Sequence, residues 1–249
     1  MKFDKIILER PNKVIYKVGD NCVKLFSEDF SKIDVLNEAL NQARVEQLDL
    51  NVPKIKEVTM IDGKWAIISE YIEGKTLKEL MEENPEKHDQ YMDLFVNVQL
   101  EILSKRCLLL NKIKDKMKRK ISLTSLDETV KYDLCTRLDG TPRHSKLCHG
   151  DFNPANIIIT PENKIYIIDW AHVTQGNASA DAARTYLIFK LHKREKEAEK
   201  YLDLFCSKSG ISKQNVQLWM PIVAASQLVK GKPGEKEFLL SWVNVVDYQ

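Results

Sequence analysis

The first third of the chain alternates short apolar runs with turn signals. The runs are residues 3–9, 13–18, 22–26, 54–61 and 64–71. Apolar-rich runs of this length, separated by turn residues, predict β-strands. Asp62-Gly63, between the last two runs, is the strongest hairpin signal, because both residue types tolerate the positive φ angles of a two-residue turn. The first three strands follow one another through short turns, which predicts antiparallel pairing and a five-strand sheet in all.

One helix is predicted within this sheet region. Ser31 is suited to cap its start, and apolar residues recur at helical spacing after it. These residues are Ile33, Leu36, Leu40 and Ala43. The helix is expected to end near residues 50–51, because Val52 precedes Pro53 and is biased away from helical backbone angles.

Beyond Gly74 the pattern becomes mainly helical. Thr76 and Glu79 have the spacing of a capping box at the start of a helix. Further helices are predicted by the apolar face Tyr91, Leu94, Phe95, Val98 and Ile102, and by periodicity over residues 180–191, 195–208, 212–229 and 234–246. Two short strands are expected at 157–159 and 164–168. The change at Gly74 predicts an α+β protein with a strand-rich lobe, residues 1–73, and a helical lobe, residues 74–249.

Composition and charge exclude several classes of protein. Lys plus Arg number 38 and Asp plus Glu 36, so the formal charge is only +2 and a dedicated nucleic-acid binder is not expected. No apolar run approaches the roughly 18 residues of a membrane span, and no membrane insertion is predicted. The five cysteines form no Cys-x-x-Cys pair, which favours reduced thiols in a cytoplasmic protein. The basic run 112–120 is interpreted as a solvated helix face or loop.

The segment most informative about function is His149-Gly-Asp-Phe-Asn-Pro-Ala-Asn156, with Asp169 thirteen residues further on. Asn156 precedes one short apolar strand and Asp169 ends the next, so the two side chains should emerge together. Amide and carboxylate oxygens suit magnesium held jointly with phosphate oxygens. Asp151, in the loop, can orient a hydroxyl and accept its proton. Any one such residue ordinarily serves local backbone bonds, but the complete pattern favours a catalytic function.

This segment resembles the catalytic loop of the aminoglycoside phosphotransferase and choline kinase superfamily. His-Gly-Asp replaces the His-Arg-Asp of protein kinases, and Trp170 follows the metal aspartate where they have Phe-Gly. The resemblance implies a bilobal, protein-kinase-like fold with residues 147–156 as the catalytic loop. It also implies Asp151 as the catalytic base, His149 as a brace of the loop, and Asn156 and Asp169 as Mg²⁺ ligands.

The resemblance extends upstream to residues that would bind ATP or GTP. It implies a lysine on the third strand that holds the α- and β-phosphates and pairs with a helix glutamate. Lys24 fits that position. Glu38 and Glu46 are the candidate partners, and Glu38 is favoured because it lies mid-helix. Strand alternation places Cys22 on the same face as Lys24. If Lys24 reaches the phosphates as the resemblance implies, Cys22 should lie over the adenine.

Residues 67–74 resemble the connector between the two lobes. Its backbone would bond the adenine edge at Glu70 and Ile72, while Ile158 and Ile168 would form an apolar floor below the base or would be ordinary core residues. No Gly-x-Gly-x-x-Gly loop lies between the first strands. Asn12 and Lys13 are the candidates to cover the triphosphate there.

The predicted function is Mg²⁺-dependent transfer of the γ-phosphate of ATP or GTP to a hydroxyl group of a small molecule. The alternatives are a protein Ser/Thr kinase-like enzyme and a nucleotide-binding regulator without turnover. The acceptor stays open between aminoglycoside, choline, sugar and other metabolites, and so does the oligomeric state. The many lysines of residues 187–249 argue mildly against a polycationic acceptor. Asp181 is interpreted as a structural anchor of the catalytic loop, and Trp170 and Trp219 as core residues.

Overall fold

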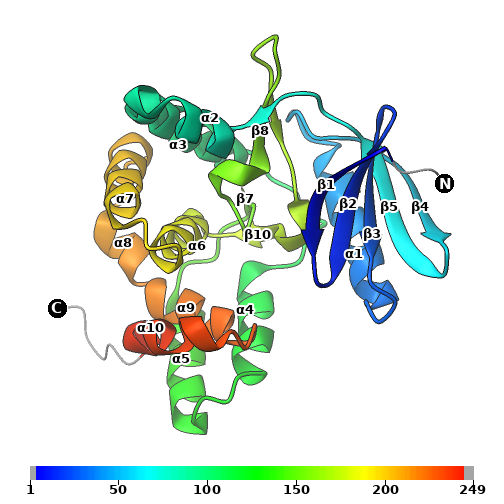
Figure 1. The fold of residues 1–249 in the computed structure, drawn as a ribbon. Coiled ribbons are helices and arrows are strands. Elements are labelled where there is room, and N and C mark those ends of the chain that lie inside the picture. The colour runs from blue at the N-terminus through cyan, green and yellow to red at the C-terminus, as the bar shows by residue number, and fades with distance from the viewer. Residues whose placement is uncertain (1–3, 244–249) are drawn as a thin grey trace. The chain divides into compact units, whose positions relative to one another are not determined.

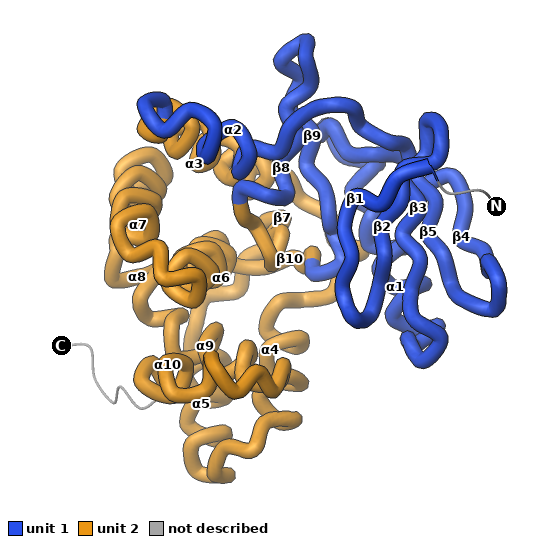
Figure 2. Tube along the Cα trace, viewed as in Figure 1, with its two compact units in different colours: residues 1–87, 154–172 blue, residues 88–153, 173–249 orange. Residues whose placement is uncertain are grey.

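A computed structural model describes residues 4–243 of the chain. Its elements divide into two compact units (Figures 1 and 2). The first unit contains residues 1–87 and 154–172, and the second contains residues 88–153 and 173–249. None of the helices in the described range combines the length and hydrophobicity that a membrane crossing requires.

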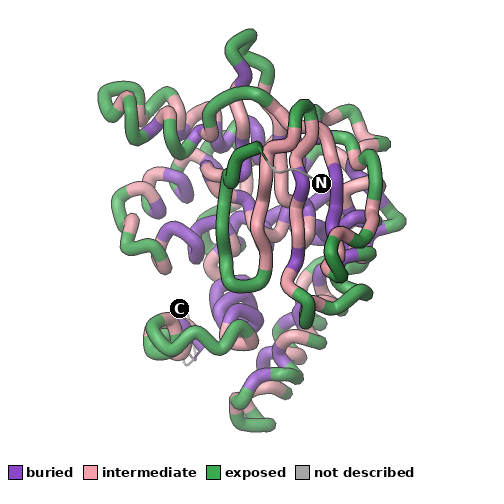
Figure 3. Tube along the Cα trace, turned by 45° about the vertical axis from the view of Figure 1, so that its right-hand side comes forward, coloured by how far each residue is buried: buried purple, intermediate pink, exposed green. Residues whose placement is uncertain are grey.

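The first unit contains the predicted antiparallel five-strand sheet. Its strands are β1 (Lys5–Arg10), β2 (Lys13–Val18), β3 (Asn21–Phe26), β4 (Ile55–Ile61) and β5 (Lys64–Glu70). They are arranged in the order β1-β2-β3-β5-β4. Asp62 and Gly63 join β4 and β5 with φ angles of 49° and 79°, as the hairpin signal predicted. The edge strand β1 is exposed along its length (Figure 3).

Helix α1 (Lys32–Val45) is shorter than predicted and faces the sheet differently. It ends at Val45 rather than near residue 50. The apolar residues whose spacing predicted it include Ile33, which is 77% exposed, while Val35 and Ala39 are buried against Phe26 and Ile67 of the sheet. The apolar part of the buried face of α1 therefore consists of Val35, Ala39 and Val45, and not of the residues whose spacing predicted the helix.

The rest of the first unit is a three-strand sheet with short helical segments. It contains β6 (Lys75–Thr76), α2 (Leu77–Glu83), η1 (Pro85–Lys87), η2 (Pro154–Asn156), β8 (Ile157–Ile159), β9 (Ile165–Ile167) and η3 (Trp170–His172). The strand order is β6-β8-β9, all antiparallel. The capping box at Thr76 is confirmed, with both reciprocal bonds to Glu79 present. A side chain at Gly74 would lie 2.4 Å from the Ile159 carbonyl oxygen, so only glycine fits between β5 and β6.

The second unit is mainly helical. Its helices are α3 (His88–Ser104), α4 (Ile113–Ser122), α5 (Glu128–Gly140), α6 (Ala178–Leu191), α7 (Glu195–Ser209), α8 (Lys213–Gln217), α9 (Met220–Leu228) and α10 (Pro233–Val243). Two short strands, β7 (Lys146–Cys148) and β10 (Thr174–Gly176), pair antiparallel. Helix α9 packs against α4, α6 and α10. Phe95 of α3 stacks on Phe152 with ring centroids 4.5 Å apart.

Two predicted helices differ from those observed. The helix expected over 212–229 is divided into α8 and α9, because Pro221 lies in the first turn of α9 and cannot occupy a helix interior. The last helix ends its described part at Val243, and residues 244–246 of the prediction lie outside the described residues. The predicted fold class, a five-strand antiparallel sheet with one helix followed by a mainly helical region, is confirmed.

Candidate active site

Three charged residues that are far apart in the sequence meet in the first unit. The Lys24 ammonium pairs with the Glu38 carboxylate and lies 3.3 Å from Oδ1 of Asp169. We call Lys24, Glu38 and Asp169 the Lys24 cluster. Lys24 is placed by the middle of β3 and Glu38 by the buried face of α1. Of the two glutamates that the sequence left open, Glu38 is the partner, while Oε1 of Glu46 accepts a hydrogen bond from the Ile55 backbone at 2.8 Å.

The environment of Lys24 strongly favours its charged form. Burial by itself would lower the pKa of Lys24, but the charges of Asp169 and Glu38 outweigh burial and raise it. The pKa of nearby Lys13 is lowered, because burial and the charge of Lys24 oppose its protonation. The charges of Asp169 and Glu38 also act on Lys13, so the sequence candidate for covering the triphosphate lies within electrostatic reach of the Lys24 cluster.

Asp169 has a left-handed backbone, with a φ of 62°. A non-glycine residue in this conformation is strained, and such strain concentrates at functional positions. Immediately after it, η3 packs against α1, and the amide of Asn41 on α1 donates to the Ala171 carbonyl at 3.4 Å. The helix that supplies Glu38 and the segment that supplies Asp169 are thus fixed to each other.

Asn156 and Asp169 lie at neighbouring ends of the β8–β9 hairpin. The Ile168 amide donates to the Asn156 carbonyl at 3.0 Å, which continues the register of the strand pair. Asn156 is buried, and the Asp169 side chain is one-third exposed. Within the described part of the chain, no three His, Cys, Asp or Glu side chains form a metal-binding group. One amide oxygen and one carboxylate nevertheless fit Mg²⁺, which keeps waters and substrate phosphates as its remaining ligands.

The predicted adenine-binding residues also belong to the first unit. Ile158 and Ile168 are half-buried, whereas Ile157 and Ile167, on the other face of the hairpin, are buried. Cys22 is half-buried on the same strand as Lys24, and burial raises the pKa of its thiol.

The connector offers one backbone position more readily than the other. The Glu70 amide already donates to the Lys54 carbonyl at 2.9 Å. Ile72 follows the end of β5. Within residues 4–243, its backbone amide donates no hydrogen bond. Ile72 therefore has the backbone amide that is better placed to bind a ligand.

The loop that contains Asp151 lies in the second unit, directly after β7. Gly150 adopts a φ of 79°, and the Asp151 amide donates to Nδ1 of buried His149 at 3.3 Å. The Asn153 amide donates to the Asp151 carbonyl at 2.9 Å. These local bonds hold the loop in a tight turn with Asp151 at its exposed side.

A buried polar network supports this loop from below. The Gly150 amide donates to Oδ1 of Asp181 at 2.7 Å, and the Gln99 side chain donates to Oδ2 at 3.1 Å. The Tyr201 hydroxyl donates to Oε1 of Gln99 at 2.6 Å. The Thr185 hydroxyl donates to the Phe152 carbonyl at 3.1 Å. Asp181 is 1% exposed, so it acts through the loop backbone, as its structural interpretation predicted.

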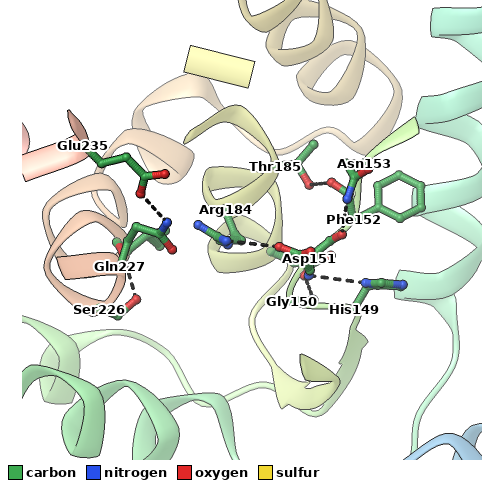
Figure 4. A network of polar contacts seen from close by, with 12 residues as sticks. His149, Gly150, Asp151, Phe152, Asn153, Arg184, Thr185, Ser226, Gln227 and Glu235 are labelled. Carbon is green, nitrogen blue, oxygen red and sulfur yellow. Dashed lines mark hydrogen bonds and ion pairs between the residues drawn. The ribbon is translucent and has the colours of Figure 1, made fainter. Parts of the chain in front are cut away.

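The side chain of Asp151 has a cationic partner that the sequence analysis did not identify. Nη2 of Arg184, on α6, donates to Oδ1 of Asp151 at 3.1 Å, and Figure 4 shows the guanidinium pointing toward the loop. Nη1 of Arg184 is enclosed and has no hydrogen-bond partner among the described residues. The available signal was the spacing of Asp181 and Arg184, which places both on the first turns of one helix.

The basic run 112–120 forms the expected solvated helix face only in part. It belongs to α4, where Lys116 and Lys120 are half-buried next to the stripe Ile113, Met117 and Ile121. Burial, followed by repulsion from neighbouring cations, lowers the pKa of Lys116 to about 7 and that of Lys120 to about 8. The charges of Arg184 and Asp151 act on both lysines, which places this side of α4 beside the catalytic loop.

Two tryptophans considered in the sequence analysis pack in the core. Trp170 is fully buried, and its indole donates to the Ile167 carbonyl at 3.0 Å. Trp219 is 2% exposed and lines a cavity of about 770 Å³ in the second unit. The lining of that cavity includes no predicted site residue.

The fold is that of protein-kinase-like small-molecule phosphotransferases. The sequence profile of the Phosphotransferase enzyme family matches residues 109–215. A thermostable mutant of aminoglycoside phosphotransferase APH(4)-Ia in complex with ADP and hygromycin B superposes with a TM-score of 0.68, at 15% identity over 96% of this chain and 89% of that one. Choline kinase LicA from Streptococcus pneumoniae gives a TM-score of 0.62, at 18% identity over 96% and 87%. No curated protein matches in sequence. The profile match and the shared fold agree with the resemblance to the aminoglycoside phosphotransferase and choline kinase superfamily.

Proposed function

We propose that this protein transfers the γ-phosphate of ATP or GTP to a hydroxyl group of a small molecule. The observation that carries the proposal is the Lys24 cluster, in which Lys24, Glu38 and Asp169 meet although the last lies 145 residues from the first. Residues 1–73 are the nucleotide-binding lobe of the proposal, and residues 74–249 supply the catalytic loop and Asp169.

Each residue has a distinct role in this mechanism. Lys24, oriented by Glu38, holds the α- and β-phosphates of the nucleotide. Asn156 and Asp169 hold Mg²⁺, which neutralises negative charge on the phosphates when bound. The backbone of Glu70 and Ile72 bonds the adenine edge. Cys22, Ile158 and Ile168 contribute the apolar surfaces around the base.

The transfer step requires Asp151. The acceptor oxygen forms a bond to the γ-phosphorus while the bond from that phosphorus to the β,γ-bridging oxygen breaks, which yields a phosphate ester and a nucleoside diphosphate. Asp151 orients the hydroxyl and accepts its proton, which then passes to solvent. His149 and Asp181 position the loop and do not touch the reacting atoms.

The test is release of nucleoside diphosphate from Mg-ATP and Mg-GTP across a panel of hydroxyl compounds. The panel includes aminoglycosides, choline, ethanolamine, sugars and homoserine, with a protein substrate as a separate arm. Asp151→Asn should retain nucleotide binding and lose at least ~10²-fold in turnover, the usual scale for a lost general base. Asp133→Asn is the matched control, because its exposed carboxylate pairs with Arg137 on the surface of α5 and should leave turnover unchanged.

Three results would contradict the proposal. Phosphorylation confined to the protein substrate would favour the protein kinase alternative. Tight Mg-nucleotide binding without turnover on any acceptor would favour the regulator. Full turnover by Asp151→Asn would show that Asp151 is not the catalytic base.

A further inference from the structure

Four cationic side chains of the second unit surround the single carboxylate of Asp151. They are Lys116 and Lys120 of α4, Arg184 of α6, and Lys230 just after α9, and we call them the cation cluster. The charge of Asp151 acts on all three lysines, and Arg184 bonds it directly at 3.1 Å. Packing of α9 against both α4 and α6 fixes the elements that supply these cations.

Among the described residues, cations outnumber the carboxylates whose charges act on the lysines of the cation cluster, which are Asp151 and Glu235. Asp151 is one carboxylate against four cations. Glu235, the other carboxylate whose charge acts on Lys230, is engaged by Gln227 at 2.7 Å and by Lys232 at 3.0 Å (Figure 4 shows the first of these bonds). Exposed Arg119 adds a further cation to the surroundings of Lys116 and Lys120. Lys116, Lys120 and Arg184 are half-buried, and Lys230 is exposed. A group of cations with so few carboxylates is stabilised by a bound anion.

The arrangement of α4 indicates that these lysines are directed toward the loop rather than scattered over the helix. Lys116 and Lys120 are four residues apart and flank the buried stripe of α4 on one side, while Lys114 and Lys118 flank it on the other. Lys118 pairs with Asp139 at 2.7 Å, and Lys114 donates to the Thr141 carbonyl at 2.5 Å. Asp139 and the Thr141 carbonyl thus hold Lys118 and Lys114. The charges of Arg184 and Asp151 act on the other pair, Lys116 and Lys120.

We infer that the acceptor is a small alcohol that itself carries an anionic group, a carboxylate or a phosphate, and that the cation cluster binds this group. The inference rests on the proposed function, because it is Asp151 that places the reacting hydroxyl beside the cluster. The nucleotide phosphates are assigned to Lys24 and to Mg²⁺ at Asn156 and Asp169, so the cation cluster is assigned to the acceptor. Charge-assisted hydrogen bonds from lysine and arginine recognise both anions.

The experiment compares alcohols that differ in charge. Glycerol, glycerate and glycerol 3-phosphate form one series, glucose, gluconate and glucose 6-phosphate form a second, and choline is the cationic member. Turnover with Mg-ATP is measured for each, and binding to the protein without nucleotide is measured by calorimetry. Anionic members should bind more tightly than their neutral counterparts, and the carboxylate and phosphate arms show which anion is preferred.

The variants separate binding of the acceptor from binding of the nucleotide. The double variant Lys116→Met, Lys120→Met should weaken anion binding and raise the acceptor KM by about 10-fold or more, the scale of a lost charge-assisted bond, and leave the KM for ATP unchanged. The charge-conserving Lys116→Arg, Lys120→Arg protein should recover most of the affinity. Lys118→Met, on the other side of the buried stripe of α4, is the matched control. The thermal midpoint of the double methionine variant should not fall, because half-buried charges are being removed.

The two proposals fail in different ways. Equal binding of neutral and anionic members, or anion binding that the methionine variants do not change, overturns the anionic acceptor whatever the turnover. A raised KM for ATP in the double methionine variant would mean that the cation cluster binds the nucleotide, which also overturns the anionic acceptor. Anion binding lost in these variants, with no turnover on any alcohol, supports the anion site and overturns the proposed phosphotransferase.

Discussion

The Lys24 cluster and the surroundings of Asp151 combine cations and carboxylates in opposite proportions. Lys24 lies between two carboxylates, and its pKa is raised because their charges outweigh the effect of burial. Lys116 and Lys120 lie among other cations with one carboxylate, and burial and repulsion lower the pKa values of both. The difference shows what each cluster can bind. An excess of carboxylates suits a divalent cation, whereas an excess of ammonium and guanidinium groups suits an anion.

The largest effect is expected from removing the charge of Asp169, which tests whether the Lys24 cluster binds a divalent cation. Asp169→Asn deletes the charged Mg²⁺ ligand of the proposed site and leaves Lys24 with Glu38 alone. Turnover should fall on the order of 10³-fold, the upper range for loss of one electrostatic group. Nucleotide binding should also become insensitive to added Mg²⁺, which a titration with and without the metal measures.

The control for this substitution is Asp62→Asn. Asp62 also has a left-handed backbone, with a φ of 49°, and lies at the tip of an exposed hairpin. Any effect of asparagine on backbone strain should therefore be common to both variants. Comparable loss of turnover in the two proteins would mean that the Asp169 carboxylate has no special role.

A second substitution tests the glutamate of the Lys24 cluster. Glu38→Gln keeps the shape of the side chain but removes the charge that orients Lys24, so the KM for ATP should rise by about 10-fold. Glu46→Gln, at the C-terminal end of α1, is the matched control, since Oε1 of Glu46 accepts a hydrogen bond from the Ile55 amide at 2.8 Å. Steady-state kinetics that show the same KM change for both glutamines would contradict the assigned pairing role.

These two predictions concern Lys24, Glu38 and Asp169, which the sequence analysis expected in one site and which meet in the structure. The resemblance implied a lysine on the third strand and a partner glutamate on the following helix. Local periodicity gave the bounds of that strand and that helix, and these pointed to Lys24 and Glu38. Asp169 was placed by the length of the β8–β9 hairpin, which fixes where the return strand ends. Local rules suffice where short elements, tight turns and fixed spacings determine which residues meet.

The cation cluster shows where local rules fail. The basic run was interpreted from composition alone, and a run of lysines is ordinarily a solvated face. The helical phase of α4 separates Lys116 and Lys120 from Lys114 and Lys118. The second pair meets α5 and Thr141, whereas the neighbours of the first pair come from α6 and α9, much later in the chain. The face of α1 was missed for a similar reason. The sheet selects Val35 and Ala39, and leaves the larger Ile33 exposed.

The third prediction concerns the pH dependence of acceptor binding at the cation cluster. Lys116, with a pKa of about 7, loses its proton as the pH rises through neutrality, so the KM for glycerate should rise between about pH 6 and about pH 9 by no more than tenfold per pH unit. The charged groups that act on it are Lys120, Arg119, Arg184 and Asp151. Lys116→Arg should reduce the change near pH 7, because arginine stays protonated. The change near pH 8 should remain, because the pKa of Lys120 is about 8. A profile that is unchanged in this variant would mean that Lys116 does not titrate in the binding step.

The same lysine should influence stability with a defined sign. Its pKa is lower in the folded protein than in the unfolded chain, so the unfolded chain binds more protons above pH 7. The contribution of Lys116 to the free energy of unfolding therefore increases as the pH rises from about 7 toward 10.5, the ordinary lysine value. Denaturant unfolding of the wild type and Lys116→Met at several pH values should show a smaller increase in the variant.

The smallest expected effect comes from a substitution in the buried network under the catalytic loop, which leaves the charges of α4 unchanged. Tyr201→Phe removes the hydroxyl that donates to Gln99 at 2.6 Å and leaves Oε1 of that amide without this donor in a buried network. The free energy of unfolding should fall by about 1–2 kcal/mol, the scale of a lost buried hydrogen bond. The cation cluster is untouched, so the acceptor KM and its pH profile should not change. If Tyr201→Phe altered the pH profile as Lys116→Arg does, the profile would report the position of the loop rather than the charge of α4.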